Sequence, residues 1–138
     1  MDPEVVQKAL EFSEDRYVFV ATSSADGLPH LAAAGQLHYI ERDRVAVEEW
    51  FCPGTIENLE ENPRVALVVW DPETDEGYQL LGRVEGVEAE AVMDGYAPEA
   101  EPEEPLPQEE RRIQVRVECV LDFRQAPHSD RPEGESCP

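Results

Sequence analysis

Positive charge is scarce in this chain of 138 residues, which has only 11 Lys and Arg against 32 Asp and Glu. The formal net charge is −21, and Lys8 is the only lysine. Nucleic acids and anionic membranes attract proteins through Lys and Arg, so this balance argues against both as partners. It does not exclude a phosphorylated small molecule that is held in a local pocket.

Cysteines are few and odd in number, and long apolar runs are missing. Cys52, Cys119 and Cys137 are widely spaced and form no CxxC motif. One pair could still form a disulfide, but we expect reduced thiols. No apolar stretch approaches the roughly 20 residues of a membrane-spanning helix. Residues 1–4 are acidic where a secretory leader would be basic. These absences predict a cytoplasmic protein with no membrane partner.

Motifs for catalysis and metal binding are also absent. The sequence has no P-loop, no glycine-rich dinucleotide fingerprint and no nucleophile motif. His30 and His38 fall on one expected strand, where eight residues span about 26 Å, so they cannot share a metal ion. The acidic segment 71–77 lacks the glycine and the flanking helices of a calcium loop. We therefore expect no metal site.

Local patterns predict two short helices among β-strands. Asp2 and Pro3 supply an N-cap and a first helical residue for a helix over 3–13. Thr55 is placed to cap a second helix over 56–61. Runs rich in β-branched and aromatic residues, separated by turn residues, predict six strands. The strands are expected at 17–23, 29–40, 44–51, 64–70, 78–92 and 113–123.

Three of these strands show how the sheet is built. The run 64–70 is almost wholly apolar, which is typical of a strand covered on both faces. The run 78–92 is long, and Gly82 and Gly86 mark bulges where a barrel would curve. The run 113–123 alternates apolar and polar residues, as a half-buried edge strand does.

The predicted fold class is therefore mainly β, with a six-stranded antiparallel barrel or sandwich. Consecutive strands without crossover helices exclude a parallel sheet. We expect one domain over residues 1–124 and a flexible tail over 125–138. Residues 94–110 contain four Pro and six Glu, so we expect them to form an acidic, solvated loop.

Several short signatures follow one another in a recognisable order. They are Ala21-Thr22, Asp26-Gly27-Leu28-Pro29-His30, Thr55-Ile56-Glu57-Asn58-Leu59, Asn62-Pro63-Arg64-Val65 and Leu81-Gly82-Arg83-Val84. In this succession residues 17–92 resemble the pyridoxamine-phosphate-oxidase-like FMN-binding split-barrel family, and look closest to its short FMN-binding proteins and flavin reductases. The resemblance implies a six-stranded split barrel that forms a homodimer, with FMN bound in two sites at the subunit interface.

The resemblance also implies where FMN would lie. Its phosphate would lie against the loop and helix start that contain Phe51, Cys52, Pro53, Gly54 and Thr55. Its isoalloxazine ring would meet the second strand, at Ala33, Ala34, Gly35 and Gln36.

Several of the candidate residues have a second interpretation. Thr55 is a phosphate donor, an N-cap or both, and Gln36 is a flavin contact or a solvated strand residue. Cys52 is a redox thiol or a packed loop cysteine. Trp50, together with Phe51, walls the flavin or packs in the barrel or dimer. A further candidate, Asn58, contacts the cofactor or fixes the helix against a neighbouring loop.

One departure from the family pattern concerns the phosphate. Many relatives place Lys or Arg in this loop, and in the short FMN-binding proteins a Lys directly precedes the Thr. This chain has Gly54 there, and no base from 45 to 63. Loss of such a charge-assisted contact removes about 1.5–3 kcal/mol. Arg64, Arg83 or an arginine of a partner subunit could replace it.

The sequence thus predicts an FMN-binding flavoprotein with a redox role, acting in electron transfer or in reduction of a small substrate as an FMN-dependent oxidoreductase. One alternative is a split-barrel dimer that has lost flavin and serves as a binding or structural module. Another is a related barrel that binds a deazaflavin. The substrate or electron-transfer partner is not specified by any motif.

Overall fold

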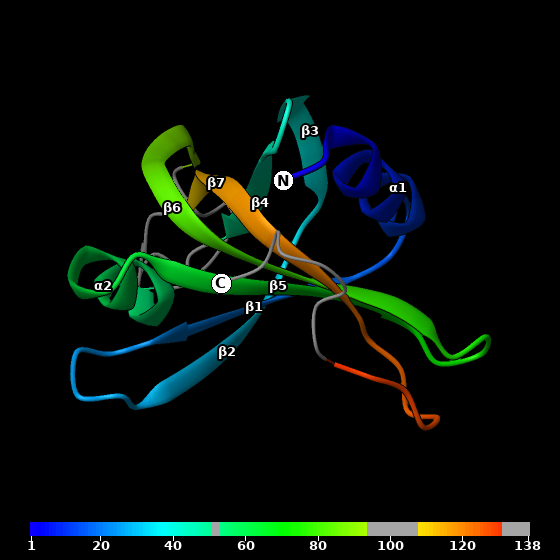
Figure 1. The fold of residues 1–138 in the computed structure, drawn as a ribbon. Helices are drawn as coiled ribbons and strands as arrows, with labels where there is room; N and C mark the ends of the chain where they lie inside the picture. The colour runs from blue at the N-terminus through cyan, green and yellow to red at the C-terminus, as the bar shows by residue number, and fades with distance from the viewer. Residues whose placement is uncertain (51–52, 94–107, 131–138) are drawn as a thin grey trace, which may run out of the picture.

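The protein, seen here in a computed structural model, is described over residues 1–50, 53–93 and 108–130 (Figure 1). Its two helices are α1 (Pro3–Ser13) and α2 (Pro53–Glu61). Its strands are β1 (Val18–Ser23), β2 (Pro29–Ala34), β3 (Leu37–Glu41), β4 (Arg44–Trp50), β5 (Arg64–Asp71), β6 (Glu76–Met93) and β7 (Gln108–Asp122). Within those ranges, no helix is long and apolar enough to cross a bilayer.

All seven strands belong to one sheet, in the order β2-β1-β5-β6-β7-β4-β3. Each pairing in this order is antiparallel. The predicted class, mainly β and antiparallel with two short helices, is confirmed. The count of six strands is wrong, because the expected strand 29–40 is divided into β2 and β3.

The division falls at Gly35 and Gln36, where the chain passes from one edge of the sheet to the other. Upstream, β2 pairs with β1; downstream, β3 pairs with β4. The Gly35 N–H donates to the Glu48 carbonyl oxygen at 2.7 Å, and the Glu48 N–H donates to the Gln36 carbonyl oxygen at 3.2 Å. The alternation of side chains carries no sign of this change of partner, so the sequence predicted a continuous strand.

Helix α1 has the bounds that the sequence predicted. The Asp2 side chain caps it by accepting a hydrogen bond from the Glu4 N–H at 2.9 Å. Its buried face includes Val6, Ala9 and Leu10, and joins the core that the inner face of the sheet forms. The largest fully buried side chains of this core include Leu67, Leu80 and Ile113.

The long strand β6 bends at the two predicted glycines. Its register against β7 shifts between Leu81 and Gly82 and again between Val84 and Gly86. Both predicted glycines therefore adjoin irregularities in the register, but the extra residue is Glu118 of β7 at the first and Glu85 of β6 at the second. These irregularities let one 18-residue strand curve with the barrel.

Strand β7 differs from its prediction in two ways. It begins at Gln108, inside the segment that was expected to form a loop. It also pairs with β6 on one side and β4 on the other, so it is not an edge strand. The alternating pattern is real, with Ile113, Val115 and Val117 buried, but alternation reports burial of one face and not position in the sheet.

Cys119 corrects the expectation of reduced thiols. It lies on the buried face of β7, 1% exposed, and is disulfide-bonded to a partner outside the described residues. Spacing along the sequence did not predict this bond, because it does not measure distance in the fold.

The hairpin between β5 and β6 holds the residues that follow β7 (Figure 1). The Asp75 carboxylate accepts hydrogen bonds from the N–H groups of Gln125 at 2.6 Å and Ala126 at 2.9 Å, and from Trp70 Nε1 at 3.1 Å. The expected flexible tail is thus tethered at its start, while residues 131–138 lie outside the described residues.

Acid should release this tether. The backbone N–H groups of Gln125 and Ala126, followed by Trp70, hold the pKa of Asp75 below its ordinary value. The stabilisation is therefore present above the unfolded pKa near about 4 and is lost as pH falls through the lower folded pKa. We expect Asp75→Asn to lower the thermal midpoint above about pH 5, with the difference from wild type shrinking in stronger acid. Asn tolerates the positive φ of 55° at this position. If the difference in thermal midpoint between wild type and Asp75→Asn stayed constant from above about pH 5 into stronger acid, the ionised Asp75 would not be what holds the tether.

Candidate functional site

Helix α2 lies over the pair formed by β1 and β2. Asn58 Nδ2 donates to Thr22 Oγ1 at 3.0 Å, and Thr22 is the cross-strand partner of His30. Gly54 precedes Asn58 by four residues and so shares its helix face. Asn58 therefore fixes the helix against strand β1, where a neighbouring loop had been expected.

The first turn of α2 begins earlier than predicted. The helix starts at Pro53, so Thr55 is inside the helix and does not act as its N-cap. The Thr55 side chain is 0% exposed, and its Oγ1 has no hydrogen-bond partner in the part of the chain that the structure describes. A buried hydroxyl without a partner is uncommon and calls for an explanation.

His30 lies against the same turn. A Cβ added to Gly54 would come 3.0 Å from His30 Nε2 and 3.4 Å from both Cδ2 and Cε1. The other ring nitrogen, Nδ1, is buried and lacks a partner among the described residues. The imidazole of His30 therefore lies against the Cβ position of residue 54.

These features fit the phosphate of a flavin nucleotide. The first N–H groups of a helix have no intrahelical acceptor and lie at the positive end of the helix dipole. Such a helix start binds anions. The first turn of α2 carries no acidic residue, although the chain has 32. Donors at Gly54, Thr55 and His30 therefore meet where the resemblance places the phosphate.

The two arginines considered as replacement bases lie elsewhere. Arg64 opens β5 just beyond the end of α2, and it is paired across the sheet with Arg83 of β6. Helix α2 has nine residues and so is about 13 Å long. Both arginines therefore start from the end of the helix opposite to Gly54.

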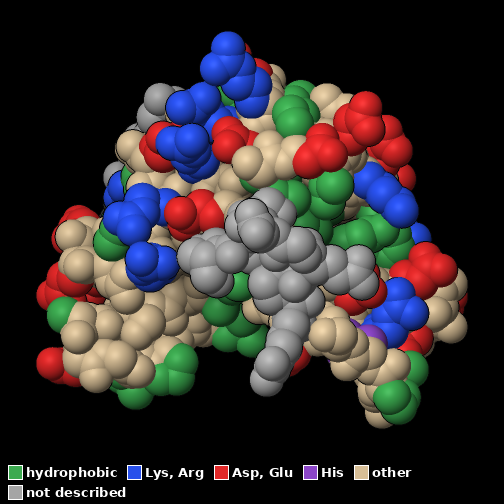
Figure 2. All heavy atoms as spheres, in the orientation of Figure 1, with side chains coloured by type: hydrophobic (Ala, Val, Ile, Leu, Met, Phe, Trp, Pro, Cys, Tyr) green, Lys and Arg blue, Asp and Glu red, His purple; other side chains and the backbone are tan. Residues whose placement is uncertain are grey.

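The same two arginines belong to a row that crosses four strands. Arg83 is paired with Arg116, and Arg116 with Arg44. Arg44 Nε donates a hydrogen bond to Glu85 Oε1 at 2.9 Å, and this carboxylate raises the pKa of the Arg44 guanidinium. Figure 2 shows most Lys and Arg side chains along the left and top of one face, with acidic side chains among them and also at the right.

The expected ring-binding stretch lies at the corner between β2 and β3. Ala33, Gly35 and Gln36 are exposed there, whereas Ala34 is 8% exposed and belongs to the core. The backbone bonds of Gly35 and Gln36 to Glu48 join this corner to β4. Only four residues lie between Glu48 and Pro53, so the corner and the start of α2 are linked by at most about 18 Å of chain.

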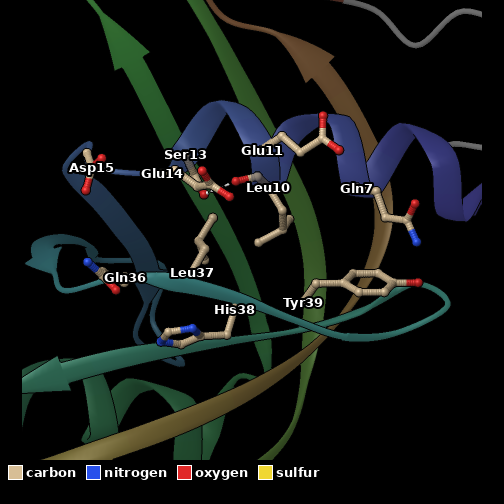
Figure 3. Close-up of a pocket in the computed structure, with 10 residues that line it drawn as sticks. All are labelled: Gln7, Leu10, Glu11, Ser13, Glu14, Asp15, Gln36, Leu37, His38 and Tyr39. Atoms are coloured by element: carbon tan, nitrogen blue, oxygen red, sulfur yellow. Dashed lines mark hydrogen bonds between the residues drawn. The ribbon is translucent and has the colours of Figure 1, made fainter.

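A pocket of about 480 Å³ opens beside this corner, between α1 and β3 (Figure 3). Gln36 lies at its edge near Asp15, and Leu10 and Leu37 point toward each other inside it. Its remaining polar lining includes Glu11 and Glu14 and contains no Lys or Arg. This acidic lining suits a polar ring edge better than a phosphate.

His30 and His38 do not lie on one strand, as the sequence had predicted, but on β2 and β3. His38 Nε2 is 3.3 Å from Glu48 Oε1, although it does not form a hydrogen bond with it. In the described ranges, no three His, Cys, Asp or Glu side chains are grouped as metal ligands.

The remaining predicted site residues are only partly visible. Trp50 ends β4, but its side chain is outside the description, as are Phe51 and Cys52 altogether. Pro53 is the exposed first residue of α2.

The role of His30 at this helix was missed by sequence reasoning. It lies 24 residues before Gly54, and the sequence was searched for a role of His30 only as a metal ligand. The available signal was the turn at Ala25-Asp26-Gly27, which sets the β1–β2 register and so brings His30 opposite Thr22.

Comparison with known proteins agrees with this geometry. A family model described as pyridoxamine 5′-phosphate oxidase matches residues 4–124. An uncharacterised protein of Methanocaldococcus jannaschii is 31% identical over 84 residues, and the match covers 59% of this chain and 56% of that relative. This chain therefore spans little more than half the length of that relative.

Two solved structures show the same fold. An FMN-binding protein from Syntrophomonas wolfei subsp. wolfei superposes with a TM-score of 0.67 at 16% identity, over 92% of this chain and 91% of that one. HupZ of Group A Streptococcus superposes with a TM-score of 0.65 at 18% identity, over 93% and 98% of the two chains. With the match of the family model, the chain belongs to the pyridoxamine 5′-phosphate oxidase family, and its fold is the split barrel of that family.

Proposed function

We propose that this protein binds FMN and takes part in a redox reaction, either as an electron-transfer flavoprotein or as an oxidoreductase acting on a small substrate. The observation that carries the proposal is the first turn of α2. There the Thr55 hydroxyl is buried without a hydrogen-bond partner among the described residues, and His30 Nε2 lies against the Cβ position of Gly54. The family and its FMN-binding structural neighbour support the same cofactor.

The protein's part in this function is to bind and orient the cofactor. When bound, FMN supplies the redox chemistry, because its ring system accepts and returns electrons. The first turn of α2 offers N–H donors to the phosphate. The exposed corner offers the backbone of Gly35, which permits close approach, and the amide of Gln36, which can donate to and accept from a polar ring edge.

A homodimer is part of the proposal, and the outer face of the sheet supports it. On β1 and β2, the apolar residues Phe19 and Leu31 are 37% and 64% exposed. On the adjoining β5, Ala66 and Val68 also face outward and are only half-buried. The apolar sequence 64–70 predicted a strand covered on both faces, and the described residues of one chain bury only one of them. A second copy would cover the other.

A different function would follow if the flavin has been lost. The absence of Lys and Arg from 45 to 63 favours a split-barrel dimer that holds no flavin and serves as a binding or structural module. A deazaflavin is a third candidate ligand. Each of these alternatives gives a different result in one binding experiment.

That experiment is to purify the protein without added flavin, denature it and identify any released cofactor by mass spectrometry. The protein is then titrated separately with FMN and with a deazaflavin. We expect FMN in the denatured sample, or saturable FMN binding with quenched flavin fluorescence. A folded protein that binds neither ligand would support the module, and preference for the deazaflavin would replace FMN as the cofactor.

A further inference from the structure

We propose that His30 donates a hydrogen bond from Nε2 to the phosphate of FMN, and so replaces the lysine that is missing at position 54. This inference rests on the proposed function. It assigns to His30, on strand β2, the side-chain contact with the phosphate that the resemblance implies for a lysine at the helix start.

The His30 ring lies in the space that a side chain at position 54 would enter. The ring of His30 fills the volume that a side chain at position 54 would need, since an added Cβ would lie 3.0 Å from Nε2. Such a separation is too short for an ordinary contact between a carbon and a ring nitrogen. A side chain at position 54 would therefore require the imidazole to move by a few tenths of an ångström. Gly54 is what allows the ring to occupy this place.

The position of the ring is fixed by the sheet and the helix together. His30 is half-buried and is paired with Thr22 of β1. Asn58 bonds Thr22 from one turn further along α2. Nδ1 is the ring nitrogen that is buried, with no hydrogen-bond partner in the described part of the chain, and Nε2 is the ring atom closest to the Cβ position of Gly54. The ring therefore presents Nε2 to the helix start.

The surroundings favour an anion at this point. Thr55 is fully buried, so the half-buried Gly54 and His30 are the donors that an incoming phosphate reaches first. No acidic residue occupies the first turn of α2. A neutral imidazole with its proton on Nε2 donates to a phosphate oxygen without requiring a second proton on the buried Nδ1. A chain with no base from 45 to 63 can thus still supply a side-chain donor to the phosphate.

The test compares FMN with riboflavin, which lacks the phosphate. Dissociation constants for both ligands are measured by flavin fluorescence for wild type, His30→Phe and His30→Gln. We expect His30→Phe, which keeps a ring but has no donor, to weaken FMN binding about tenfold to a hundredfold. Riboflavin binding should change less than about twofold. His30→Gln keeps an N–H donor and should lie much closer to wild type.

Position 54 provides a second test with a matched control. Gly54→Ala adds a Cβ that shifts the ring by a few tenths of an ångström, so it should weaken FMN binding less than His30→Phe does while leaving riboflavin binding unchanged. Gly86→Ala is the control, because a Cβ there meets nothing within 4 Å. In the His30→Ala background the space is free, so adding Gly54→Lys should restore much of the lost FMN affinity.

Thermal midpoints establish that each variant is folded. The proposal is overturned if wild type prefers FMN to riboflavin but His30→Phe binds FMN as tightly as wild type does. It is also overturned if that variant loses affinity equally for both ligands, since the ring would then not act on the phosphate. Failure of wild type to bind any flavin would instead overturn the proposed function itself.

Discussion

Gly82→Ala is expected to destabilise the fold by about 1–3 kcal/mol, the range for overpacking a tightly packed position. A Cβ on Gly82 would fall against the carbonyl oxygen of Arg116 and 2.8 Å from Val115 Cγ1. Both contacts belong to β7, whose backbone is fixed by pairing on both sides, so neither can withdraw. Chemical denaturation measured by the change in fluorescence or circular dichroism gives the free energy of unfolding.

Gly86→Ala is the control for this prediction, because it lies at the second bulge of the same strand but has open space around its Cβ position. It should change stability by less than about 0.5 kcal/mol. Equal changes in the free energy of unfolding for the two substitutions would show that the close approach of Gly82 to β7 is not the reason that residue 82 is glycine.

Leu31→Glu is expected to convert the proposed homodimer, with its cofactor site shared between subunits, to a monomer and to reduce FMN affinity by about a hundredfold or more. Leu31 is 64% exposed on the outer face of β2, so the substitution leaves the core of one chain intact. Within a dimer it would bury a carboxylate without a partner. Light scattering reports the mass, and FMN titration reports the affinity.

Val5→Glu is the matched control, because it adds the same charge on α1, where Val5 is 37% exposed. It should leave both mass and affinity unchanged. A Leu31→Glu protein that remains dimeric and binds FMN normally would rule out this face as the subunit interface.

Much of the fold was readable from local sequence. Asp2 and Pro3 indicated the start of α1 through capping chemistry, and Gly82 and Gly86 indicated where the register between β6 and β7 is irregular. The break at Gly35 was missed, because the change of pairing partner from β1 to β4 depends on closure of the whole sheet. Closure involves residues distant in sequence, which local patterns do not reveal.

The candidate site, too, could be predicted from local sequence only in part. The segment around Gly54 and Thr55 was found through its resemblance to a family motif, and the structure places it at the start of α2. The contribution of His30 was not found, because it depends on register between β1 and β2 and on how α2 crosses them. The absence of a base at position 54 was visible in the sequence, but the side chain that fills its space was not.

The central claim is that the start of α2 holds the phosphate of a flavin nucleotide, and the affinity of the wild-type protein for FMN relative to riboflavin tests it most directly. Isothermal titration calorimetry with each ligand measures that ratio. The account predicts saturable FMN binding that is tighter than riboflavin binding by about tenfold or more. Equal affinity for the two ligands, or no binding of FMN by the folded protein, would contradict it.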